Sequence, residues 1–103
     1  MSEIKSEEGG KYCLRLFVAG DEPNSKKAEE TLKRLAETRL RGLCTIEVVD
    51  VLNDFRAAIE NNILVVPTLV VEGPDPPVKI IGSLSDVRKV LDALGLPNEE
   101  ELL

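Results

Sequence analysis

The chain has 103 residues, 43% of them hydrophobic, and a formal net charge of −6, which fits one small globular domain. The acidic balance argues against nucleic acid as the main partner, because phosphate binding requires a basic surface. The sequence contains no histidine, which excludes histidine-based catalysis and argues against a zinc site. No stretch approaches the roughly 20 apolar residues of a membrane helix. We therefore expect a cytoplasmic protein that does not enter the membrane.

Polar and acidic ends flank the expected domain. Residues 1–10 have the composition of a solvated leader rather than a signal peptide, and residues 98–103 form an acidic tail. The domain is expected to occupy residues 11–97. Its first element is a strand over Tyr12–Val18, where only Arg15 interrupts the apolar run. Such a run is typical of a central strand that is covered on both faces.

A helix and a second strand are predicted next. The helix is expected over residues 25–41, because its apolar side chains recur at spacings of three and four and form one stripe. Asn24 or Ser25 is expected to cap its first turn, and Gly42 to end it. The β-rich stretch over residues 43–51 is predicted as the second strand.

The second half of the domain is predicted to hold a short helix, a hairpin of two strands and a last helix. A proline inside a strand cannot donate a ladder hydrogen bond, so the third strand is expected to begin after Pro67. In chain order we first expect a short helix that starts at Asn53 or Asp54 and carries Phe55, Ala58 and Ile59. Two strands follow, one from about Thr68 and one over residues 78–81, with a turn at 73–77 between them. The last helix is expected to be capped by Ser83 or Ser85, to end at Gly95, and to turn these side chains inward: Val87, Val90, Leu91 and Leu94.

The resulting order is β-α-β-α-β-β-α. A β-α-β opening implies a parallel pair with a right-handed crossover, and the closing hairpin adds an antiparallel pair. A mixed four-stranded sheet of this order resembles the thioredoxin-like fold. That fold carries a proline before its third strand, which implies a cis bond between Val66 and Pro67.

The reactive thiols of a thioredoxin-like enzyme are missing. Such enzymes place Cys-x-x-Cys between the first strand and the first helix, where the helix N-terminus lowers the thiol pKa. Here this loop, residues 20–25, has no cysteine, and Asp21 and Glu22 would disfavour a thiolate. Cys13 and Cys44 are interpreted as free, small, buried side chains, with a disulfide between them as the less favoured alternative.

No other catalytic arrangement is evident. The serines have no histidine to activate them, and no glycine-rich phosphate loop is present. We interpret the carboxylates of Asp21, Glu22 and Asp50 as solvated surface groups. A thiol oxidoreductase is thus the class that the sequence argues against most firmly, and an interaction domain without catalysis or cofactor is what remains.

Five sequence strings carry a resemblance to a known family. LRLFVAG, PNSKKAEETLKRL, VVDVLND, VPTLV and PPVKIIGSLSDVRKVL occur in this order between Tyr12 and Leu94. This pattern is similar to that of the circadian clock protein family KaiB. The resemblance implies a protein that binds a KaiC-type ATPase ring and modulates its phosphorylation cycle and output. The alternative is a stand-alone thioredoxin-like sensor or interaction module of a two-component signalling system.

The resemblance also implies a binding surface. It comprises the start of the first helix and the segment before the proline, which here are Lys26, Lys27, Glu60, Asn61, Asn62, Ile63 and Leu64. The two lysines have a plain alternative interpretation as ordinary solvated side chains. Asn62 departs from the family, because cyanobacterial relatives tend to carry lysine there. Glu47 stands where those relatives use a basic residue against KaiA, which argues against a KaiA-type partner.

The family is known for two folds. One is thioredoxin-like, and the other is a resting fold of order β-α-β-β-α-α-β that is often tetrameric. The resting fold would make a strand near the end of the domain, whereas Val87–Leu94 contains good helix formers and is followed by the helix-ending Gly95. We therefore expect a bias toward the thioredoxin-like fold. Whether the chain forms a dimer or a tetramer stays open.

Overall fold

The computed structural model describes residues 12–72 and 77–96, and its elements follow the predicted order. In chain order they are β1 (Tyr12–Val18), α2 (Pro23–Glu37), β2 (Cys44–Asp50), α3 (Phe55–Glu60), β3 (Thr68–Val71), β4 (Val78–Ile81) and α4 (Val87–Ala93). This is the thioredoxin-like order β-α-β-α-β-β-α. The expected leader, the acidic tail and most of the 73–77 turn lie outside the described residues.

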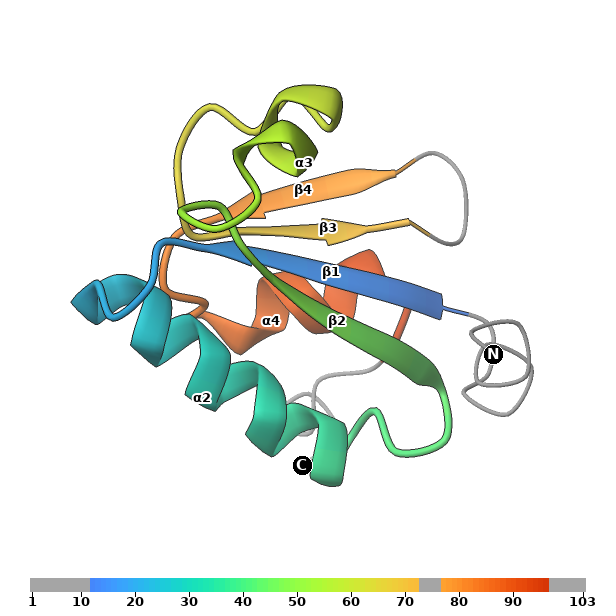
Figure 1. Cartoon of the computed structure of the whole chain (residues 1–103). Helices are drawn as coiled ribbons and strands as arrows, with labels where there is room; N and C mark the ends of the chain where they lie inside the picture. The colour runs from blue at the N-terminus through green and yellow to red at the C-terminus, as the bar shows by residue number, and fades with distance from the viewer. Residues whose placement is uncertain (1–11, 73–76, 97–103) are drawn as a thin grey trace.

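The four strands form one mixed sheet in the order β2-β1-β3-β4. β1 runs parallel to β2, and β3 and β4 form an antiparallel hairpin, as the sequence predicted. β3 also pairs antiparallel with β1. Helices α2 and α4 cover one face of the sheet, and the short helix α3 lies over the other face (Figure 1). We call the face under α3 the open face.

The two faces carry cores of different size. On the α2 and α4 side, Leu14, Leu16 and Val18 of β1 are buried in a large cluster with both helices. On the open face, Phe17 is buried in a small cluster whose other buried members are Val49, Ala57 and Val70. The alternation of β1 between these two clusters explains its nearly unbroken apolar run. Since the apolar cluster around Phe17 is small, α3 is held by few apolar contacts.

Both ends of α2 differ from the prediction. The helix begins at Pro23, and the Glu22 carboxylate caps it, so the expected caps Asn24 and Ser25 were wrong. Proline suits a first helical position, because its missing N–H would have no partner there. The helix ends at Glu37 instead of near Gly42. At the following Thr38, the hydroxyl donates to the carbonyl of Arg34 at 2.9 Å, a local bond of the kind that competes with the helical ladder.

The caps of the two later helices agree with the sequence in part. Asp54 caps α3 by accepting from the backbone N–H of Ala57 at 3.2 Å, as predicted. Asp86 caps α4 by accepting from the N–H of Arg88 at 3.2 Å, so the expected serine caps, Ser83 and Ser85, were wrong. Gly95 follows α4 with a φ of 71°, the left-handed conformation expected of a glycine at a helix end.

Candidate partner-binding site

The helix N-terminus that activates a thiol in redox enzymes is occupied here by a carboxylate. Glu22 accepts hydrogen bonds from the backbone N–H of Ser25 at 2.8 Å and of Asn24 at 3.2 Å. These bonds, that from Ser25 first, hold the pKa of Glu22 below its ordinary value. The free donors of the first turn are therefore satisfied by the chain itself, and the loop is not arranged for thiol chemistry.

The two cysteines do not form a redox pair. Both are free and half-buried, a lower degree of burial than the sequence predicted. In the parallel register, Cys44 is opposite Tyr12 and Cys13 is opposite Thr45, so the two thiols point to opposite faces of the sheet. Burial, with a smaller contribution from Cys13, raises the pKa of Cys44 to about 11. The alternative of a disulfide between them is thus not what the structure contains.

The described part of the chain has neither a cluster of metal-ligating side chains nor a membrane-spanning helix. Residues 12–72 and 77–96 contain no group of three or more cysteine, aspartate or glutamate side chains that could hold a metal ion. Within the same residues, no helix has both the length and the apolar character needed to cross a bilayer.

Lys26 and Lys27 lie on the early part of α2, and both are exposed. The ammonium group of Lys26 is 3.9 Å from a carboxylate oxygen of Asp21, and the two side chains are 54% and 97% exposed. An ion pair this exposed contributes little to stability, because water and salt screen it. The positive charge at this position is therefore accessible to a partner.

The segment Glu60–Leu64 forms a tight reversal at the end of α3. Asn61 closes the helix, and Asn62 turns the chain with a φ of 57°. The backbone N–H of Ile63 donates to the carbonyl of Ala58 at 2.8 Å. Leu64 then projects with 93% of its surface exposed. Val65 and Ile81 are also exposed and line the same groove as Leu64, and apolar side chains that are exposed as a group, rather than singly, mark interaction surfaces.

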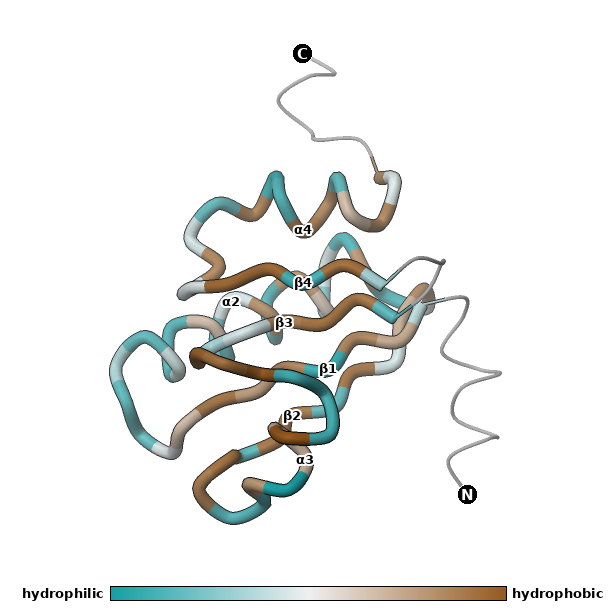
Figure 2. Tube along the Cα trace, turned by 90° about the horizontal axis from the view of Figure 1, so that it is seen from above, coloured by the Kyte–Doolittle hydropathy of each residue, from teal (hydrophilic) through white to brown (hydrophobic). Residues whose placement is uncertain are grey.

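The chain continues from Leu64 to β3 as an apolar stretch. Val65 is half exposed, and the Val66–Pro67 bond is cis, the isomer that the resemblance to the thioredoxin-like fold implied. Figure 2 shows Ile63–Val66 as a continuous hydrophobic segment between the polar end of α3 and the start of β3. A groove of about 180 Å³ lies between this stretch and the outer strand β4. It is lined by Asn62, Ile63, Leu64, Val65, Thr68, Lys79 and Ile81.

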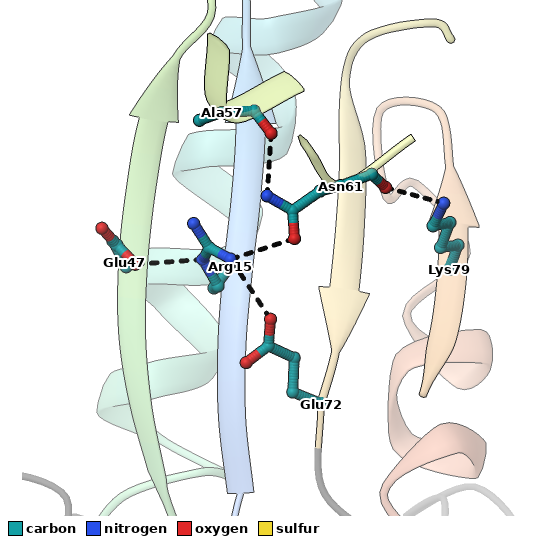
Figure 3. Close-up of polar contacts among 6 residues, drawn as sticks. All are labelled: Arg15, Glu47, Ala57, Asn61, Glu72 and Lys79. Carbon is teal, nitrogen blue, oxygen red and sulfur yellow. Dashed lines mark hydrogen bonds and ion pairs between the residues drawn. The ribbon is translucent and has the colours of Figure 1, made fainter. Parts of the chain in front are cut away.

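A polar cluster on the open face supports this segment (Figure 3). We call it the open-face cluster, and it consists of Arg15, Glu47, Asn61, Glu72 and Lys79. Arg15 donates to Glu47, Asn61 and Glu72, and Lys79 donates to backbone carbonyls of the segment. The sequence analysis singled out Arg15 only as a break in an apolar strand. A lone charge in a strand that is otherwise buried on both faces was the signal for this cluster.

The two predicted groups of site residues lie on opposite faces of the sheet. α2, which carries Lys26 and Lys27, begins at the end of the sheet where β1 ends and β3 begins, and the chain after α3 runs over the open face toward that end (Figure 1). Sequence reasoning did not identify the exposed apolar residues next to this segment. Phe55 and Ile59 on α3 are 69% and 67% exposed, because the helix turns Ala57 toward the sheet instead. Their spacing of four residues was the available signal.

Solved structures of other proteins have a fold similar to that of this chain. The solved structure of the N-terminal domain of Synechococcus elongatus SasA is similar, with a TM-score of 0.66, 24% identity, and 82% of this chain and 84% of that domain covered. The Drosophila melanogaster thioredoxin Deadhead gives a TM-score of 0.70 at 19% identity and covers 91% of this chain and 87% of its own. At these identities the likeness shows the thioredoxin-like fold alone.

Sequence relatives are much more similar. The circadian clock oscillator protein KaiB of Picosynechococcus sp. is 48% identical over 91 residues, which are 88% of each chain. The KaiB of Microcystis aeruginosa is 47% identical over 89 residues, 86% of each chain. The family model of the KaiB domain matches residues 15–96. The chain therefore belongs to the KaiB family of circadian clock proteins.

Proposed function

We propose that the protein acts in the cytoplasm as a clock or timing adaptor that binds a KaiC-type ATPase ring and modulates its phosphorylation cycle. It does so as a docking surface, with no catalysis of its own and no cofactor. The observation that carries the proposal is the segment Glu60–Leu64, an ordered reversal that exposes 93% of the Leu64 side chain beside an apolar groove. The two free cysteines suit the reducing cytoplasm.

Charge supports a specific docking orientation. The chain has a formal net charge of −6, yet Lys26 and Lys27 present positive charge on the first turns of α2, at the end of the sheet toward which the segment leads. An apolar anchor bordered by lysines suits a partner surface that combines an apolar pocket with acidic side chains.

A KaiA-type partner is not part of this proposal. The family resemblance implies that Glu47 stands where cyanobacterial relatives carry a basic residue. Its carboxylate pairs with the Arg15 guanidinium at 3.1 Å, and its side chain remains 62% exposed on the outer strand β2. A surface that has lost its positive charge at this position should repel an acidic partner instead of attracting it.

The test is sedimentation of the full chain with a purified KaiC-type hexamer, with and without ATP. The wild type is expected to co-sediment with the ring. Lys26→Glu combined with Lys27→Glu should weaken the affinity by about tenfold or more, since it reverses two charges at the proposed contact. Thermal stability should stay nearly unchanged, because both side chains are exposed.

A matched control is available on the same helix. Lys33→Glu combined with Arg34→Glu makes the same change in charge at exposed positions further along α2, and it should leave ring binding intact. Equal weakening by both pairs would show a general charge effect and remove Lys26 and Lys27 from the site. If the wild type does not bind the ring either with or without ATP, the adaptor function is overturned and the sensor-module alternative is favoured.

A further inference from the structure

The Arg15 side chain connects the sheet to the end of α3. Its Nε lies 3.1 Å from a Glu47 oxygen, and its Nη1 donates to the side-chain oxygen of Asn61 at 3.2 Å and to Glu72 at 3.3 Å. The guanidinium also lies 5.2 Å from the centre of the Phe17 ring. Only 22% of the side chain is exposed. Hydrogen bonds to a charged donor that is shielded from water in this way are stronger than ordinary surface bonds.

Asn61 passes this connection to the helix. While its oxygen accepts from Arg15, its side-chain nitrogen donates to the carbonyl of Ala57 at 2.7 Å. The Lys79 ammonium group donates to the backbone carbonyls of Asn61 and Asn62, at 3.0 Å each. Figure 3 shows Arg15 on β1 and Lys79 on β4 reaching Asn61 from two sides. The first two residues after α3 are thus bound to two different strands.

The segment has few other contacts with the sheet. α3 has six residues, and Ala57 is its buried side chain. A helix this short is not stable on its own in water. Asn62 has a positive φ, which costs energy for a residue other than glycine. Ile63 packs against the cluster around Phe17, and the polar bonds of Arg15 and Lys79 add the contacts that fix Asn61 and Asn62 over the strands.

We propose that Arg15 and Lys79 are positioning residues, which hold the Asn61–Leu64 reversal in the conformation that presents Leu64 to the partner. The proposal rests on the proposed function, since it concerns the same binding surface. Neither side chain needs to touch the partner. Their loss lowers the fraction of molecules that are competent to bind, and the apparent affinity falls by the same fraction.

The first measurement uses the free protein. Arg15→Met and Lys79→Met remove the bonds to the segment, and amide hydrogen exchange at Asn62–Leu64 is expected to accelerate by about tenfold in each, while exchange in β1 and β3 stays slow. Lys79→Arg keeps a donor for the two carbonyls and should restore wild-type exchange. Glu47→Gln removes only the charge of the Arg15 partner on β2, away from the segment, and should have no effect on exchange at Asn62–Leu64.

The second measurement is the affinity for the purified KaiC-type hexamer. Arg15→Met and Lys79→Met are expected to weaken binding by about tenfold, whereas Glu47→Gln and Lys79→Arg bind like the wild type. Leu64→Ala is then combined with Lys79→Met. If Lys79 acts by positioning Leu64, the affinity of the double variant should lie within about twofold of the affinity of Leu64→Ala alone. Independent contributions would multiply instead.

The outcomes separate this inference from the proposed function. Unchanged exchange in both methionine variants overturns the inference. Faster exchange with undiminished ring binding also overturns it and leaves the adaptor function standing. Multiplicative effects of Lys79→Met and Leu64→Ala would show that Lys79 makes a contact of its own, which contradicts a positioning role. A wild type that does not bind the ring overturns both.

Discussion

At the scale of single residues, Cys44 shows how this sheet disfavours the chemistry of its fold relatives. Its thiol is half-buried at the start of β2, and burial raises its pKa to about 11. A raised pKa keeps the thiol neutral at physiological pH, and only the thiolate is a nucleophile. Within the described residues, the one helix N-terminus next to β1 is capped by Glu22 and offers no activation.

This pKa makes a direct prediction for alkylation by iodoacetamide. In a Cys13→Ser variant at pH 8, native Cys44 should react at least about 100-fold more slowly than in urea, where an ordinary thiol has a pKa of about 8.5. The native rate should rise about tenfold per pH unit up to pH 10, because the thiolate fraction does so below the pKa. Mass spectrometry of timed samples gives both rates. Equal rates in the native and unfolded protein would contradict a buried, protonated thiol.

At the scale of elements, α2 provides the main wall of the larger core. Leu32 is 1% exposed and packs in the cluster on the α2 and α4 side. Leu32→Ala should lower the free energy of unfolding by about 2–5 kcal/mol, the sum of lost burial and the cavity left behind. Urea denaturation followed by circular dichroism measures the change. Lys33→Ala, one residue further and exposed, is the control and should stay within about 0.5 kcal/mol of the wild type.

The elements could be predicted better than their ends. β1, β3 and β4 have the predicted bounds or starting points, because alternating or β-branched runs limited by proline and glycine specify strands well. The ends of α2 and the cap of α4 were missed, because several neighbouring residues could each act as a cap. The choice of Glu22 over Ser25 follows from tertiary structure, since Ser25 is buried and its hydroxyl oxygen accepts from the N–H of Ala19 at 3.1 Å.

At the scale of the whole molecule, the thioredoxin-like order of elements could be predicted from the sequence, but the contacts that hold the candidate site in place could not. Val87–Ala93 forms the helix that its composition favours. The residues of the proposed surface were identified from the family resemblance, and the structure shows which hydrogen bonds hold the end of α3 in place. Arg15, Asn61 and Lys79 are separated by 46 and 18 positions, so only the folded sheet brings them together. Single-sequence patterns describe neighbours along the chain, whereas this cluster depends on strand order and register.

The two groups of the proposed surface are related only through the fold. Lys26 and Lys27 lie on α2, which begins where β1 ends, and the segment Glu60–Leu64 leads over the open face toward the same end of the sheet, where β3 begins (Figure 1). A second groove, of about 260 Å³, lies between α2 and β2, and Lys33, Ile46 and Val48 are among its lining residues. The described residues therefore offer more than one groove, and we assign the ring to the groove beside Leu64.

The most direct test of this assignment is the hydrogen-exchange footprint of the KaiC-type hexamer on the full chain. We expect the ring to slow amide exchange at Asn61–Leu64 and at the first turn of α2, and to leave the exchange rates of Ile46–Val48 unchanged. Protection confined to β2 and its groove, or no protection anywhere at ring concentrations that saturate binding, would contradict it.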